Sequence, residues 1–225
     1  MTININNKAY KFPAHLTMEQ WCHIVDNYDF EDISEYVQII NYLTDAPVEL
    51  LEKAESGTLE LAMAFVIRML NYRVPTNMIN FEELTFGQFI DLDIYLNMGV
   101  TKHYGEILEI LQVKKEGAEF CMYAIETYNN YRIYIYRQYK KLFEIEDSAF
   151  ESESEGSVDP LSVARNWYQI IVSLANEDLL KIDEVTDQPL KKALNFMAYQ
   201  KEKQLEENLK RLKQQREYDL SRRRK

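Results

Sequence analysis

The sequence is poor in the two residues that most often interrupt helices, with only six glycines and five prolines among its 225 residues. Both residues mark turns, so their scarcity favours long helices over many short strands. Hydrophobic residues make up 46% of the chain, which is enough to fill a core. The composition therefore predicts a folded, mainly α-helical protein.

Sequence motifs of catalysis are also lacking. The chain has no phosphate-binding glycine motif and no G-x-S-x-G nucleophile motif. The histidines lie at His15, His23 and His103, without the spacing of a metal site. Cys22 and His23 are adjacent, and neighbours on a helix point to different faces, so they are not expected to form a catalytic pair. We therefore expect a protein that is not an enzyme and has no catalytic residue.

A group of carboxylates is the strongest candidate for metal binding. Asp91 and Asp93 flank Leu92, and Glu82 and Glu83 lie upstream. Residues two apart on a helix do not face each other, so the two aspartates cannot share one ion. We expect these residues to form a solvated acidic face, with no bound metal and no cofactor.

The small number of cysteines and the absence of a long apolar run indicate where the protein is expected to be located. Cys22 and Cys121 are the only cysteines, and we interpret both as reduced thiols of a cytosolic protein. The longest apolar run, LAMAFVI at 61–67, is far shorter than the roughly 20 residues that span a bilayer. The N-terminus has no apolar segment typical of a signal peptide. These features predict a soluble protein without a membrane partner.

Charge is segregated along the chain. Residues 144–159 contain seven acidic residues and no lysine or arginine, whereas residues 199–225 contain ten basic and five acidic residues. The formal net charge is −11, so the tail carries +5 and residues 1–198 carry −16. An acidic body repels phosphates over roughly 10 Å, which argues against a specific nucleic-acid partner. Segregated charge favours contacts with other proteins.

The apolar pattern divides the chain into three parts. Residues 1–143 are expected to form a helical domain, with a small β-hairpin at residues 2–12 and an apolar core helix at 58–72. Residues 144–159 are expected to be an acidic flexible linker. Residues 160–225 are expected to form a C-terminal helical segment that starts at Asp159-Pro160 and ends in a long basic helix.

One short pattern occurs twice. Leu16-Thr17-Met18-Glu19-Gln20-Trp21 and Leu84-Thr85-Phe86-Gly87-Gln88-Phe89 share Leu-Thr-x-x-Gln-aromatic. Threonine and glutamine three residues apart form a capping box, in which each side chain bonds the backbone of the other residue. The repeat fits two independent capping boxes, each followed by a core aromatic residue, and it also fits an internal duplication.

Aromatic and basic residues supply candidates for partner binding. The helix expected at 119–143 carries more tyrosines than one buried face can hold, and tyrosine is favoured at interfaces. The C-terminal segment presents an amphipathic face and a basic end. The candidate partner-binding residues are Tyr131 and Tyr134, then Trp167, Tyr168 and Ile171, and then Arg222, Arg223 and Arg224.

Three segments carry a resemblance to a known family. Residues 13–54 (PAHLTMEQWCHIVDNYDFEDISEYVQIINYLTDAPVELLEKA) and 81–96 (FEELTFGQFIDLDIYL) are similar to the N-terminal helical domain of tail assembly chaperones and related virion assembly proteins of tailed phages. Residues 166–203 (NWYQIIVSLANEDLLKIDEVTDQPLKKALNFMAYQKEK) resemble the C-terminal part of the longer form in such families.

The resemblance implies a non-enzymatic role in phage morphogenesis. Such a protein holds a long, aggregation-prone virion protein, such as a tape measure, until the tail polymerises, and it works in the host cell cytoplasm. The alternative is a structural component of the virion, either a neck or ring subunit beneath the portal or a packaged internal protein. The expected partners are other phage virion proteins, and a homo-oligomer is left open.

Overall fold

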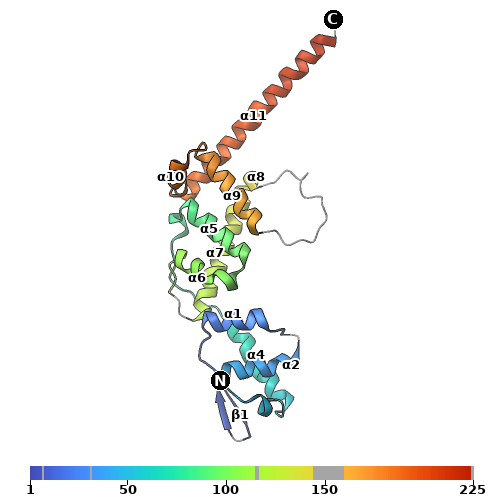
Figure 1. Cartoon of the computed structure of the whole chain (residues 1–225), viewed down its shortest axis with the longest axis vertical. Coiled ribbons are helices and arrows are strands. Elements are labelled where there is room, and N and C mark those ends of the chain that lie inside the picture. The colour runs from blue at the N-terminus through green and yellow to red at the C-terminus, as the bar shows by residue number, and fades with distance from the viewer. Residues whose placement is uncertain (7, 31, 115–116, 144–159, 224–225) are drawn as a thin grey trace. The chain divides into compact units, whose positions relative to one another are not determined.

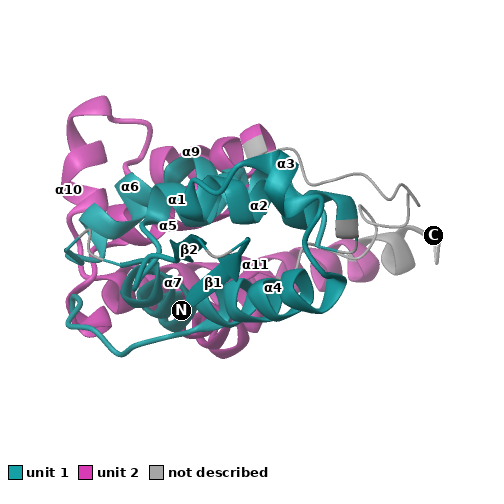
Figure 2. Cartoon of the chain, turned by 90° about the horizontal axis from the view of Figure 1, so that it is seen from below, with its two compact units in different colours: residues 1–79, 98–128 teal, residues 80–97, 129–225 magenta. Residues whose placement is uncertain are grey.

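The computed structural model describes residues 1–6, 8–30, 32–114, 117–143 and 160–223. The chain forms two compact units, shown in different colours in Figure 2. Unit 1 contains residues 1–79 and 98–128, and unit 2 contains residues 80–97 and 129–225. The predicted fold class is confirmed, because the described chain is mainly helical with one small N-terminal hairpin.

The hairpin opens unit 1. Strands β1 (Thr2–Ile5) and β2 (Lys8–Lys11) pair antiparallel, with Ile3 opposite Tyr10. Alternate residues Ile3, Ile5 and Tyr10 are buried, as the period of a half-buried strand requires. Two strands are marginal alone, and Phe12 just beyond β2 packs edge-on against Phe65 of the helix behind, with ring centroids 5.5 Å apart.

Helices fill the rest of unit 1 (Figure 1). They are α1 (Met18–Asn27), α2 (Ile33–Thr44), α3 (Val48–Leu51), α4 (Ser56–Asn71), α6 (Val100–Ile110) and the first part of α7 (Ala118–Gln138). The apolar helix expected at 58–72 is α4, which buries Met63 and Val66 but leaves Leu61 65% exposed. Only one face of α4 therefore serves the core.

Unit 2 is built from the remaining elements. They are the 3-10 turn η1 (Phe81–Glu83), α5 (Phe86–Met98), the second part of α7, α8 (Lys140–Phe143), α9 (Pro160–Leu174), the 3-10 turn η3 (Leu179–Lys181), α10 (Ile182–Thr186) and α11 (Leu190–Arg223). The largest fully buried side chains of this unit include Phe86, Phe89 and Leu92 of α5. Helix α5 therefore lies at the core of unit 2.

Both capping boxes are present. The Thr17 hydroxyl accepts from the backbone N–H of Gln20 at 3.1 Å, and the Gln20 side chain accepts from the Thr17 N–H at 3.0 Å. Thr85 and Gln88 make the same two bonds, at 3.2 and 3.0 Å. Each box satisfies donors that the first turn of a helix otherwise leaves unpaired.

The two boxes also share a tertiary pairing that a capping box does not require. Thr17 forms an antiparallel bridge with Gly117 just before α7, and Thr85 forms one with Pro189 just before α11. In unit 1 the Ala118 N–H donates to the carbonyl of Leu16 at 2.7 Å, and in unit 2 the Leu190 N–H donates to the carbonyl of Leu84 at 3.0 Å. The repeated sequence therefore accompanies a repeated local structure, which favours the duplication over two independent caps.

The predicted boundary at 144–159 falls on residues outside the described part of the chain. The contacts place residues 160–225 in the same unit as residues 80–97 and 129–143, so the compact units do not follow that boundary. Separate folding of residues 1–143 stays a prediction.

Candidate partner-binding surface

A buried carboxylate fixes the position of α9 within unit 2. Asp93 of α5 is only 2% exposed. Its Oδ1 accepts from Arg132 Nε at 2.5 Å and from the Tyr136 hydroxyl at 2.7 Å, and its Oδ2 accepts from Trp167 Nε1 at 2.8 Å. Three donors from α7 and α9 therefore converge on one side chain of α5. The expectation that Asp93 belongs to a solvated acidic face is wrong, because every described contact of this carboxylate lies inside unit 2.

Aromatic rings surround the Trp167 indole. Phe86, Phe89 and Phe143 meet it edge to face, with centroids 5.9, 6.0 and 6.0 Å away. Edge-to-face pairs contribute about 0.5–1.5 kcal/mol each beyond the area that they bury. Trp167 is 5% exposed and Ile171, one turn further, is 8% exposed. These two predicted partner-binding residues are therefore side chains of the unit 2 core.

The same network perturbs Tyr136. Burial raises the pKa of Tyr136 well above its usual range, and the negative charge of Asp93 raises it further. Burial lowers the pKa of Arg132, but Asp93 and Tyr136 outweigh this effect, so the net shift is upward. At neutral pH the tyrosine hydroxyl thus stays protonated and the guanidinium stays charged, as both must to donate to the carboxylate.

The raised pKa predicts a loss of stability at alkaline pH. An unfolded tyrosine titrates near pH ~10, so the unfolded chain releases this proton before the folded chain does. Stability from the protonated Tyr136 is complete below about pH 10 and is lost as the pH rises toward the folded pKa. We expect wild type to lose about 1.4 kcal/mol per pH unit more than Tyr136→Phe above that pH, measured by urea unfolding. Tyr134→Phe is the control and should follow wild type, and a Tyr136→Phe slope equal to that of wild type would contradict this assignment.

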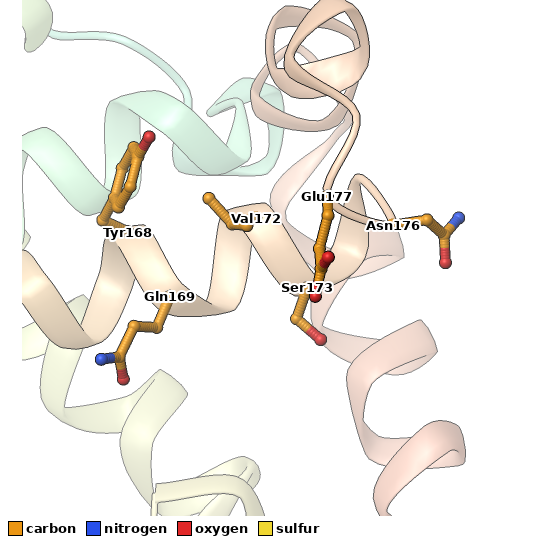
Figure 3. Close-up of a pocket in the computed structure, with 6 residues that line it drawn as sticks. All are labelled: Tyr168, Gln169, Val172, Ser173, Asn176 and Glu177. Carbon is orange, nitrogen blue, oxygen red and sulfur yellow. The ribbon is translucent and has the colours of Figure 1, made fainter.

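The outer side of α9 is open. Tyr168 follows the buried Trp167 directly, yet it is 58% exposed, because consecutive residues of a helix point about 100° apart. A groove with a volume of about 490 Å³ lies beside it, and Figure 3 shows the side chains that line this groove. The groove is lined by Tyr168, Gln169, Val172, Ser173, Asn176 and Glu177.

A turn with unusual backbone follows α9. Asn176 and Glu177 have φ angles of 53° and 62°, in the left-handed region that residues with a side chain rarely adopt. Backbone bonds hold this turn, with the Glu177 N–H donating to the Val172 carbonyl at 2.9 Å. Asp178 then caps η3 by accepting from the Leu180 N–H at 3.1 Å. Hydrogen bonds from Lys181 and Leu180 lower the pKa of Asp178, so it is ionised at neutral pH.

The turn presents two leucines to solvent. Leu179 is 75% exposed and Leu180 is 86% exposed. A second hollow, of about 100 Å³, is lined by residues from both sides of the turn, among them Tyr168, Val172, Leu179 and Ile182. These four residues are called the α9–η3 face below. The carboxylates of Glu177 and Asp178 also line this hollow and give it an acidic edge.

The other predicted site residues lie elsewhere. Tyr131 is half-buried, with its hydroxyl donating to the Phe81 carbonyl at 3.3 Å and its ring stacked near the Phe81 ring. Tyr134 is 55% exposed on α7, so Tyr134 and Tyr168 are the two most exposed of the predicted site residues whose side chains are described. Arg222 and Arg223 belong to α11, but their side chains lie outside the described residues, as does Arg224 entirely.

The structure also shows the surroundings of a cysteine and a histidine that were considered as candidates for chemistry. Burial, and then the charge of Asp26, raises the pKa of the Cys22 thiol to about 11, so the thiol is protonated at neutral pH. His15 Nδ1 lies 2.5 Å from the buried Glu119 carboxylate.

Within the described ranges, no three histidine, cysteine, aspartate or glutamate residues gather as they would around a metal ion. Among the described helices, none has the length and apolar character needed to cross a membrane.

Comparison with known proteins returns no match, whether the chain is set against family models, curated proteins or solved structures.

Proposed function

We propose that this chain is a non-enzymatic assembly protein that binds another protein through the α9–η3 face. The observation that carries the proposal is the exposure of Leu179 and Leu180 on a hydrogen-bonded turn. Single exposed leucines are common on protein surfaces, but here Leu179 shares a hollow with the exposed ring of Tyr168. A grouped apolar surface of this kind is typical of a protein-binding site.

The backbone of the turn supports a role for this face. A residue with a side chain costs on the order of 1 kcal/mol or more in the left-handed conformation, and Asn176 and Glu177 both adopt it. That cost is retained although it leads to exposed leucines, which add nothing to the core of unit 2. Strain of this kind is concentrated at functional sites, because the surrounding structure holds a shape that a partner recognises.

The chemistry of the face indicates the kind of partner. Tyr168, Val172, Leu179 and Ile182 supply an apolar floor, and Glu177 and Asp178 supply negative charge at the edge. An amphipathic helix with leucine-like anchors and a lysine or arginine beside them would complement both features. Long helical virion proteins offer many segments of this type.

The resemblance to tail assembly chaperones supports a specific role. In this role the chain binds a long virion protein, such as a tape measure, in the host cytoplasm and releases it as the tail polymerises. Asp93 and Arg132 form a buried structural pair, and in the proposed role the chain works by adhesion without a chemical step. A structural subunit of the virion would use the same surface permanently.

Co-expression with a long helical tail protein tests this proposal. We expect wild type to raise the soluble fraction of that protein and to be absent from purified mature particles. Leu179→Ser should lower the soluble fraction several-fold, because it removes an apolar anchor from the face. Leu61→Ser, which changes a leucine of similar exposure in unit 1, is the matched control and should act as wild type. Presence in mature particles would favour the structural subunit, and equal effects of both variants would contradict the assigned face.

A further inference from the structure

The second half of α11 leaves the body of unit 2. Its last described contacts with α8 are a hydrogen bond from Lys201 Nζ to the Lys141 carbonyl and a Lys141–Glu202 ion pair at 3.9 Å. Every side chain from Glu202 to Glu217 is exposed, and Figure 1 shows the C-terminal part of α11 extending away from the other helices of unit 2. A single solvated helix is marginal in water, so this segment gains if another element covers it.

Three leucines follow one side of this exposed helix. Leu205, Leu209 and Leu212 are 53%, 58% and 53% exposed. Their spacing of four and then three residues places them on the same face, and it is the spacing of a coiled-coil seam. In heptad terms, Leu209 occupies an a position, and Leu205 and Leu212 occupy d positions. Among the described residues, nothing from the same chain covers this seam.

The charges beside the seam have opposite sign in its two halves. Glu202, Glu206 and Glu207 lie in the N-terminal half, against one lysine. Lys210, Arg211, Lys213 and Arg216 lie in the C-terminal half, against the single acidic residue Glu217. A helix with this distribution is complementary to a copy of itself that runs in the opposite direction, because each acidic half then meets a basic half.

We propose that two copies of this chain associate through antiparallel pairing of their α11 helices at Leu205, Leu209 and Leu212. In this arrangement Leu209 packs on Leu212 of the second copy, Leu205 packs on the aliphatic stem of Arg216, and the two-fold axis repeats both contacts. Glu206 and Lys213 both occupy e positions, which face each other in an antiparallel pair. Two identical Glu206–Lys213 attractions therefore flank the leucines.

Parallel pairing is disfavoured by the same charges. Glu202 and Arg216 lie seven residues before and after Leu209, so they share its a position in the seam. A parallel pair would set Glu202 against Glu202, and Arg216 against Arg216, at the centre of the interface. Like charges placed opposite each other destabilise, whereas the antiparallel pair separates them. The seam covers only about two heptads, fewer than the three or four of a long coiled coil, so the dimer should dissociate on dilution.

Charge reversal in the full chain tests the pairing. Sedimentation velocity over a roughly hundredfold range around micromolar concentration should show a monomer–dimer equilibrium for wild type. Glu206→Lys and Lys213→Glu should each weaken the dimer about tenfold, because each turns two attractions into two repulsions. The double variant restores both attractions with reversed sign and should return to the wild-type dissociation constant. A parallel pair would not show this rescue, because residues 206 and 213 do not meet in it.

Two further variants complete the test. Glu207→Lys makes the same change of charge on the side of α11 away from the leucines and should leave the dimer unchanged. Leu209→Ser should abolish the dimer while circular dichroism shows the helical content of the body retained. A wild type that is monomeric at every concentration, a larger assembly, or a double variant that is not rescued would each overturn the proposal. The pairing involves residues 202–217 and is independent of the α9–η3 face.

Discussion

Asp93→Ala should lower the free energy of unfolding of unit 2 by about 3–5 kcal/mol. The substitution leaves the guanidinium of Arg132 without its carboxylate, and it leaves the Tyr136 hydroxyl and the Trp167 N–H without their acceptor. Removing one member of a buried ion pair costs more than the pair contributes, because the remaining charge stays in a poorly solvated place.

The two tryptophans allow each unit to be followed separately. Trp21 belongs to unit 1 and Trp167 to unit 2, and the chain has no others. In a Trp21→Phe background, fluorescence during urea unfolding reports on unit 2 alone. Asp91→Ala is the matched control, since Asp91 lies on the same helix and is exposed, and we expect it to change stability by less than about 0.5 kcal/mol.

A double replacement distinguishes the effect of leaving a charge unpaired from the effect of changing the side chains in this buried site. Replacing Asp93 by leucine and Arg132 by methionine together should recover most of the stability that Asp93→Ala loses, because no unpaired charge remains. A loss below about 1 kcal/mol for Asp93→Ala would contradict the role of this carboxylate as the common acceptor for α7 and α9.

Trp167→Ala should destabilise unit 2 by about 3–5 kcal/mol, whereas Tyr168→Ala should change its stability by less than about 0.5 kcal/mol. The alanine at 167 removes an indole packed between Phe86, Phe89 and Phe143, together with a hydrogen bond to Asp93. The alanine at 168 removes a ring that is mostly in solvent. The two neighbours thus lie on different faces of α9, one buried and one exposed.

Urea unfolding monitored by circular dichroism at 222 nm measures both effects, because the signal does not depend on the replaced ring. Trp167→Phe keeps an aromatic ring but loses the donor, so it should cost about 1–2 kcal/mol and fall between the other variants. A Trp167→Ala protein as stable as Tyr168→Ala would show that the indole is not part of the core. Trp167 would then again be a candidate for partner binding.

The local parts of the fold could be predicted from the sequence. Thr17 with Gln20, and Thr85 with Gln88, form the predicted capping boxes because that motif depends only on residues three apart. The alternation in residues 2–12 likewise predicts the hairpin. Such features depend on neighbours in the chain, so no knowledge of the tertiary structure is needed to recognise them.

The Asp93 network could not be predicted in the same way. Its partners lie 39 to 74 residues away in the sequence, and no motif of fixed spacing predicts these contacts. One signal was present, since Asp93 follows Phe89 by four residues and so lies on the apolar face of α5. A carboxylate on such a face indicates a buried partner.

The exposure of the leucines of η3 is a second feature that the sequence does not predict. A short helix at Leu179 and Leu180 fits the sequence whether these side chains are buried or open. Their exposure depends on the left-handed conformations of Asn176 and Glu177, which turn the chain after α9. Asparagine favours this conformation, but glutamate does not, so only one of the two residues predicts the turn from the sequence.

The most direct test of the proposed adhesive role is the affinity of the full chain for the long helical tail protein that we propose as its partner. Titration calorimetry should give at least a tenfold weaker dissociation constant for Tyr168→Ala combined with Leu179→Ser than for wild type, with an unchanged urea midpoint. An affinity equal to that of wild type would contradict binding through the α9–η3 face.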